Sequence, residues 1–206
     1  MTDDPLDPFA VAEKARGACL EVLADVIDDE LDLATACSEY TVAGVAEHLC
    51  RSMTLLGTVA RQGAGADPGA DGGADLPTRI GRSASEALTA WQERGLDGTV
   101  QIGSSSYSAA LAVEIVSLEL LVHGWDIADA TGRSLHVDPD VAAHVLACAR
   151  RLVTADKRGR GFAAEVPVDP HAPALQRLVA FTGRAPVGLD GRIRDARFPN
   201  VNPSNR

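Results

Sequence analysis

The chain has 206 residues, of which 46% are hydrophobic, and this is enough apolar material for one ordinary domain with its own core. The 29 acidic and 19 basic side chains give a formal net charge of −10, which argues against nucleic acid as a partner, because phosphate binding requires a basic surface. No apolar run approaches the ~20 residues that span a bilayer, and the first residues lack the features of a signal peptide, so we expect a soluble, cytoplasmic protein without a membrane partner.

The first third of the chain has the hydrophobic spacing of amphipathic helices. Apolar residues at three- and four-residue steps predict a first helix over residues 8–29 and a second that begins near Thr41, a candidate N-cap. The inward face of the second helix is expected to be a broad apolar stripe. The stripe consists of Val45, Leu49, Met53 and Leu56, widened by Leu55 and Val59. Residues 63–75 are rich in Gly, Ala and Asp and are predicted to be a flexible loop.

The remaining elements are also mainly helical. A third helix is expected around residues 80–91, and a short extended piece at 99–102. The longest helix should cover residues 106–131, with 104–107 at its N-terminus and Gly132 just after its end. A fifth helix is expected over 138–154, and a sixth, short helix opens at Pro173 and ends near Gly183.

These elements predict an all-α bundle that forms one domain over residues 1–206, with residues 184–206 as a surface tail. The four cysteines contain no C-x-x-C pair, and a domain this rich in apolar residues needs no disulfide framework. We therefore expect Cys19, Cys37, Cys50 and Cys148 to be free thiols.

The helix over 106–131 is apolar in nearly every direction, yet it carries Glu119, His123 and Asp126 within an arc of about 60°. A buried carboxylate requires a partner or a cation, and a carboxylate and an imidazole one turn apart can be two ligands of a divalent metal. On the second helix, His48 falls inside the widened apolar stripe and is predicted to point inward as the third ligand. The alternative is a buried hydrogen-bond network without a metal.

Other polar groups provide weaker candidates. His144 and Cys148 lie one turn apart and would suit zinc, although His144 could instead reach solvent. His136 and His171 are interpreted as surface residues. The basic residues between 150 and 160 could attract an anionic substrate, or form a solvated loop.

Three segments, residues 37–49, 119–132 and 178–184, resemble the DinB-like metal-binding proteins. More specifically, they resemble the branch related to mycothiol-dependent maleylpyruvate isomerase. The most specific pattern is His48 followed by Glu119-Leu-Leu-Val-His123-Gly-Trp-Asp, and Tyr40 stands where the family usually has Trp. The resemblance implies a DinB-like four-helix bundle with additional short helices, often dimeric, so a homodimer is expected.

The same resemblance implies a divalent metal, commonly zinc, with nickel an alternative in recombinant material. By position its ligands would be His48, Glu119 and His123, the trio that the helix positions also select. The residues after His136 leave room for two helices and a tail rather than the isomerase's additional domain. The resemblance therefore extends to the fold and the metal site, and not to maleylpyruvate as the substrate.

A metal with three protein ligands keeps an open position, which a low-molecular-weight thiol such as mycothiol would occupy as a thiolate. The favoured function is a thiol-dependent S-transferase or isomerase that acts on a small electrophilic substrate through this thiolate. Asp126 would orient His123, or would instead be a surface or helix-end acid. The alternative is a non-catalytic metal-binding or ligand-sensing protein that acts through dimerisation or partners.

Overall fold

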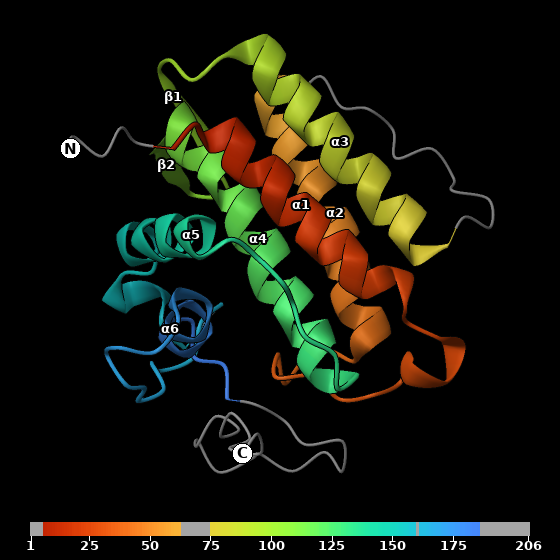
Figure 1. Cartoon of the computed structure of the whole chain (residues 1–206). Coiled ribbons are helices and arrows are strands. Elements are labelled where there is room, and N and C mark those ends of the chain that lie inside the picture. The colour runs from red at the N-terminus through yellow and green to blue at the C-terminus, as the bar shows by residue number, and fades with distance from the viewer. Residues whose placement is uncertain (1–5, 63–74, 160, 186–206) are drawn as a thin grey trace.

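The computed structural model describes residues 6–62, 75–159 and 161–185, and it is mainly helical (Figure 1). The described residues form the helices α1 (Pro8–Ala24), α2 (Val42–Ala60), α3 (Leu76–Arg94), α4 (Ala109–Ala130), α5 (Pro139–Leu152) and α6 (Ala174–Phe181), the short 3-10 helices η1 (Asp28–Glu30) and η2 (Ala155–Lys157), and the strands β1 (Thr99–Ile102) and β2 (Ser105–Ser108). The predicted all-α fold class is confirmed.

The four long helices α1 to α4 form the bundle. Helix α1 packs on α4, and α2 packs on both α3 and α4. Helices α5 and α6 lie together on the other side of α4, as Figure 1 shows. Helix α4 is therefore covered from both sides, which explains why nearly its whole circumference is apolar and buried.

A close approach between α1 and α4 depends on Gly124. A methyl group at this position would lie 3.3 Å from both Cβ and Sγ of Cys19 and 3.3 Å from Leu135. Contacts this short require the neighbours to shift, so the absence of a side chain at residue 124 allows the two helices to pack closely.

Several predicted helix ends are confirmed by their capping geometry. The hydroxyl of Thr41 accepts a hydrogen bond from the backbone N–H of Gly44, as expected for the N-cap of α2. Gly132 follows α4 with a positive φ of 71°, a conformation that favours glycine. Helix α5 starts after Asp138, whose carboxylate accepts from the N–H of Asp140.

The first helix ends earlier than predicted, at Ala24 rather than at residue 29. A run of acidic side chains follows, and negative charge near a helix C-terminus is unfavourable because of the helix dipole. Glu30 instead accepts from the backbone N–H of Ile27, and Arg133 donates to Glu30 and to the carbonyl of Asp25. These bonds hold residues 28–30 in the separate 3-10 turn η1. Ile27, which precedes this turn, is 59% exposed.

The segment before α4 forms a hairpin. Residues 99–102 are extended as predicted, but residues 105–108, predicted to belong to the start of the long helix, are the second strand. The strands pair antiparallel from Thr99 opposite Ser108 to Ile102 opposite Ser105. Gly103, with φ of 59°, opens the two-residue turn between them, and glycine suits this conformation. Helix α4 therefore begins at Ala109, capped by the hydroxyl of Ser108.

Two predicted irregular segments lie largely outside the described residues. Of the loop predicted over 63–75, only Asp75 is described, and it is the N-cap of α3 rather than a loop residue. Of the tail predicted over 184–206, Arg184 is described and is buried, so the prediction of a surface position is wrong for this residue.

All four cysteines lie in the described ranges and are free thiols, as predicted. Among the helices that the structure describes, none combines the length and the apolar character needed to cross a membrane.

Candidate metal centre

The imidazoles of His48 and His123 and the carboxylate of Glu119 converge between α2 and α4. Nε2 of His48 lies 3.2 Å from Oε2 of Glu119, and Nε2 of His123 lies 3.8 Å from the same oxygen. One ligand atom from each residue lies within 4.8 Å of the other two. The tertiary structure thus brings together the three residues that the sequence pattern selected.

The local helical geometry explains this convergence. Glu119 and His123 are one turn apart on α4, and His48 projects from α2 onto the same face. Tyr40, in the loop before α2, stacks on the His48 ring with 5.4 Å between centroids. The apolar stripe predicted on α2 is too wide at Leu55, which is 52% exposed. The inward orientation predicted for His48 is observed, because its ring contacts Glu119 and His123 on α4.

The groups around Glu119 lower the pKa of its carboxyl. Burial raises the pKa of its carboxyl, but the hydrogen bond from His48 and the charges of His123 and His48 outweigh burial and lower the pKa to about 2. Ser52, one turn after His48, has its hydroxyl 3.3 Å from Nε2 of His48 and also lowers the pKa of Glu119. The centre therefore holds one negative charge beside two imidazoles.

The second nitrogen of His123 contacts Asp126. Nδ1 of His123 lies 2.9 Å from Oδ2 of Asp126, whose side chain is completely buried. A carboxylate in this position can accept a hydrogen bond from Nδ1 and so fix the orientation of the ring, with Nε2 facing Glu119. This is the position expected for a residue that orients His123.

The charge of Asp126 is compensated by Arg184, which the sequence analysis missed. Nε and Nη2 of Arg184 lie 3.4 Å from Oδ1 and Oδ2 of Asp126, and both side chains are buried. Gly183 turns the chain after α6 with φ of 86°, and Arg184 then donates from its backbone N–H to Val179. The available signal was the physical requirement that a carboxylate on a buried helix has a cationic partner.

A cavity of about 230 Å³ adjoins this ion pair. Residues 36–39, 159, 161–163 and 182–184 line it, so three segments that are distant in the sequence form its walls. Cys37 and Arg184 are both part of its lining. The Asp126 side of the candidate centre is therefore close to a space that a small molecule or ion can enter.

Cys37 is a second residue whose position the sequence analysis did not anticipate. It lies close to His123 and Asp126: the sulfur of Cys37, a ring nitrogen of His123 and a carboxylate oxygen of Asp126 are within 4.8 Å of one another. Burial and the nearby charge of Asp126 raise the pKa of the Cys37 thiol, an effect that Arg184 partly offsets. This group and the His48, Glu119 and His123 group share one imidazole.

The alternative zinc pair predicted on the fifth helix does not form a cluster of three. Nε2 of His144 lies 3.2 Å from Oε1 of Glu114, which also forms an ion pair with Arg151. Cys148 is buried, and burial raises its pKa to about 12. Within the described residues, neither His144 nor Cys148 belongs to a group that could hold a metal through three side chains.

The remaining polar candidates lie outside the centre. His136 and His171 are exposed, as predicted. Lys157 donates to Tyr107 and to the carbonyl of Leu152, and Arg158 donates to two backbone carbonyls. These two residues of the basic segment are therefore held by the fold rather than forming a solvated loop, whereas residue 160 lies outside the described ranges.

Comparison with known proteins identifies related sequences. Residues 12–128, from α1 to near the end of α4, match the family model described as mycothiol maleylpyruvate isomerase N-terminal domain. Uncharacterized protein MT0763 of Mycobacterium tuberculosis strain CDC 1551 and uncharacterized protein Rv0738 of strain H37Rv are each 31% identical over 181 residues, which cover 87% of this chain and 98% of the relative. No solved structure gives a significant match.

Proposed function

Because the chain belongs to the mycothiol maleylpyruvate isomerase N-terminal domain family, we propose that it binds one divalent metal ion through His48, Glu119 and His123 and uses it in thiol chemistry. The convergence of these three side chains, each with a ligand atom within 4.8 Å of the others, is the observation that supports the proposal.

The donor set fits zinc. Two imidazoles and one carboxylate form a common ligand set of catalytic zinc sites, in which three protein ligands leave one position open. When bound, the metal would supply a Lewis acid that lowers the pKa of a thiol held in that open position. Nickel has the same preference for imidazole, which accounts for its expected presence in recombinant material.

The residues of the chain have distinct roles in this proposal. Glu119 supplies the negative charge of the ligand set, and its lowered pKa of about 2 favours the ionised form. His123 would keep its proton on Nδ1 and donate a hydrogen bond from it to Asp126, so that Nε2 presents a lone pair toward Glu119. His48 is held from one side by Tyr40, which limits the rotation of its ring.

The proposed substrates are a low-molecular-weight thiol of the mycothiol type and a small electrophile. The reaction would be S-transfer, in which the thiol sulfur forms a bond to the electrophilic carbon, or an isomerisation in which that bond forms and later breaks. The family match supports thiol chemistry of this kind. The homodimer, the single domain and the cytoplasmic location remain predictions.

The metal content of protein purified without chelators tests the site. We expect about one metal ion per chain, as for a single site with three protein ligands. The His48→Ala variant should lose this metal, and a matched His136→Ala variant, which alters an exposed histidine, should keep it. Absence of metal from the wild type at neutral pH would instead support a buried hydrogen-bond network.

A second measurement tests the activity. The metal-loaded protein should consume an electrophilic test substrate together with mycothiol, and His48→Ala should not. Full metal occupancy without thiol binding or turnover would contradict the enzymatic proposal and favour a non-catalytic metal-binding or sensing protein.

A further inference from the structure

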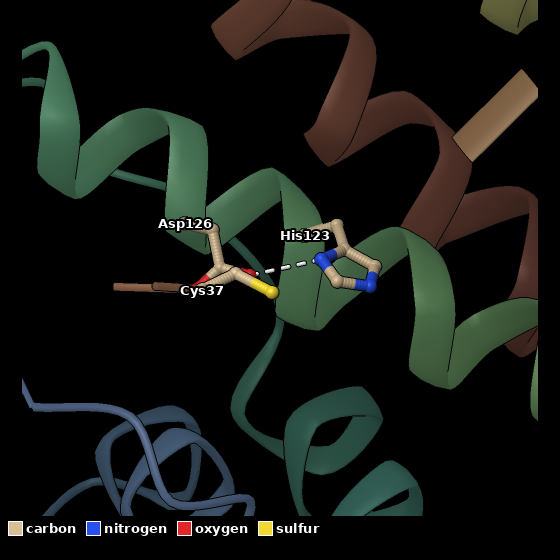
Figure 2. Close-up of side chains that lie close together, drawn as sticks. All are labelled: Cys37, His123 and Asp126. Carbon is tan, nitrogen blue, oxygen red and sulfur yellow. Dashed lines mark hydrogen bonds and ion pairs between the residues drawn. The ribbon is translucent and has the colours of Figure 1, made fainter. Parts of the chain in front are cut away.

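His123 has polar groups at both of its ring nitrogens. Nε2 faces Glu119 at 3.8 Å, and Nδ1 lies 2.9 Å from Asp126. On the Nδ1 side, Figure 2 shows the sulfur of Cys37 beside the Asp126 carboxylate and facing the His123 ring. The imidazole therefore lies between two sets of ligand atoms.

The two sets differ in their chemistry. The set with His48 and Glu119 contains only nitrogen and oxygen donors, whereas the set with Cys37 and Asp126 adds a sulfur. Thiolate sulfur is a soft donor that favours the softest cations, such as Cd²⁺ and Cu⁺, whereas imidazole and carboxylate ligands suit the borderline cations Zn²⁺ and Ni²⁺. A thiol that coordinates a cation releases its proton, so binding at this set would discharge one proton from Cys37 to solvent.

Asp126 retains the capacity to coordinate a cation. Its two contacts with Arg184 are both 3.4 Å, which is long for a charge-assisted hydrogen bond. An ionised carboxylate offers about four lone-pair sites, so the contacts with Arg184 and His123 leave at least one site for a cation. Cys37 also lines the cavity of about 230 Å³, which provides a route for an ion from solvent.

We propose that Cys37, Asp126 and Nδ1 of His123 form an alternative site for a thiophilic cation, beyond the metal site of the proposed function. When a cation binds Nε2 of His123, the proton stays on Nδ1, which donates a hydrogen bond to Asp126. When a cation binds Nδ1, the proton stays on Nε2, which donates to Glu119. Because a neutral imidazole offers one lone pair at a time, the two sites exclude each other. The softness of the cation decides which site is filled.

Cadmium titration followed by ultraviolet absorption tests the proposal. In the metal-free wild type, added Cd²⁺ should produce the charge-transfer band of a sulfur–cadmium bond. Cys37→Ser should lose the band, whereas Cys50→Ser, which alters the other half-buried cysteine, should keep it. Previous saturation with Ni²⁺ should suppress the band in the wild type. No band in the wild type, a band that persists in Cys37→Ser, or simultaneous binding of Ni²⁺ and Cd²⁺ would overturn the proposal.

Two further measurements separate this site from the first. The His48→Ala variant should no longer bind nickel but should keep the sulfur–cadmium band. The measurements therefore distinguish an error in the proposed His48 site from an error in the proposed Cys37 site. If Cys37→Ser does not fold, as judged by circular dichroism, cadmium NMR of the unaltered chain provides the same information. In that experiment, a cadmium chemical shift that shows no sulfur ligand would overturn the proposal.

Discussion

Both carboxylate oxygens of Asp126 lie 3.4 Å from nitrogens of Arg184, although the two residues are 58 positions apart in the sequence. Asp126 belongs to α4 of the bundle, and Arg184 follows α6. The family match ends at residue 128, so the guanidinium that compensates the buried acid comes from outside the matched segment. The segment after α6 is thereby linked to the residue that contacts Nδ1 of His123.

Replacing Arg184 should strongly destabilise the protein. Arg184→Met removes the cation and leaves a buried carboxylate without compensation, which costs about 3–5 kcal/mol in comparable pairs. Urea unfolding of the metal-free protein measures this loss. Arg51→Met is the matched control, because Arg51 is exposed on α2 and its replacement should change stability by no more than about 0.5 kcal/mol. Equal effects of the two substitutions would contradict the importance of the buried pair.

Asp126→Asn should weaken zinc binding at the site formed by His48, Glu119 and His123, although Asp126 is not a ligand of that site. The amide is a poorer acceptor for Nδ1 of His123 and can present its NH₂ group instead, so the ring loses its fixed orientation. Loss of such a partner typically reduces metal affinity by about 10–100-fold. Competition with a chromophoric zinc chelator measures the affinity. Asp140→Asn, which removes the same charge from an exposed position on α5, should leave it unchanged.

Two glycine-to-alanine substitutions should have opposite effects. At residue 124 the new methyl group would lie 3.3 Å from Cys19 and Leu135, and overpacking of this kind costs about 1–3 kcal/mol. At Gly17, inside α1, the new methyl group would meet no atom within 4 Å apart from its chain neighbours and the backbone of its own helix. Gly17→Ala should therefore stabilise the protein by up to about 1 kcal/mol through helix propensity. The midpoints of urea unfolding give the sign of each effect, and a neutral Gly124→Ala would contradict the close approach of α1 and α4.

The stabilising effect of Glu119 should decrease in acid. Its folded-state pKa of about 2 lies below the ordinary value of 4.5, so the unfolded chain binds more protons between these values. The contribution of the ionised group is complete above pH 4.5 and is lost as the pH falls toward 2. The difference in unfolding free energy between metal-free wild type and Glu119→Gln should therefore be smaller at about pH 3 than at neutral pH. A difference that does not change with pH would contradict the lowered pKa.

Much of the architecture follows from local sequence patterns. Hydrophobic periodicity places the helices, and capping residues such as Thr41 and Asp138 mark where two of them begin. The convergence of His48, Glu119 and His123 is also accessible from the sequence, because residues four apart on a helix share a face and the apolar stripe shows which face is inward. These are short-range properties of regular helices.

The features that the sequence analysis missed depend on contacts between distant segments. The hairpin at 99–108 requires cross-strand pairing, which a run of serines does not reveal. Cys37 lies in a loop and Arg184 follows α6, so no helical period relates either residue to Asp126. The sequence alone determined the helices and the three candidate ligands, because helical spacing makes them local. Only the packing of α6 and of the loop before α2 places the guanidinium of Arg184 and the thiol of Cys37 beside Asp126.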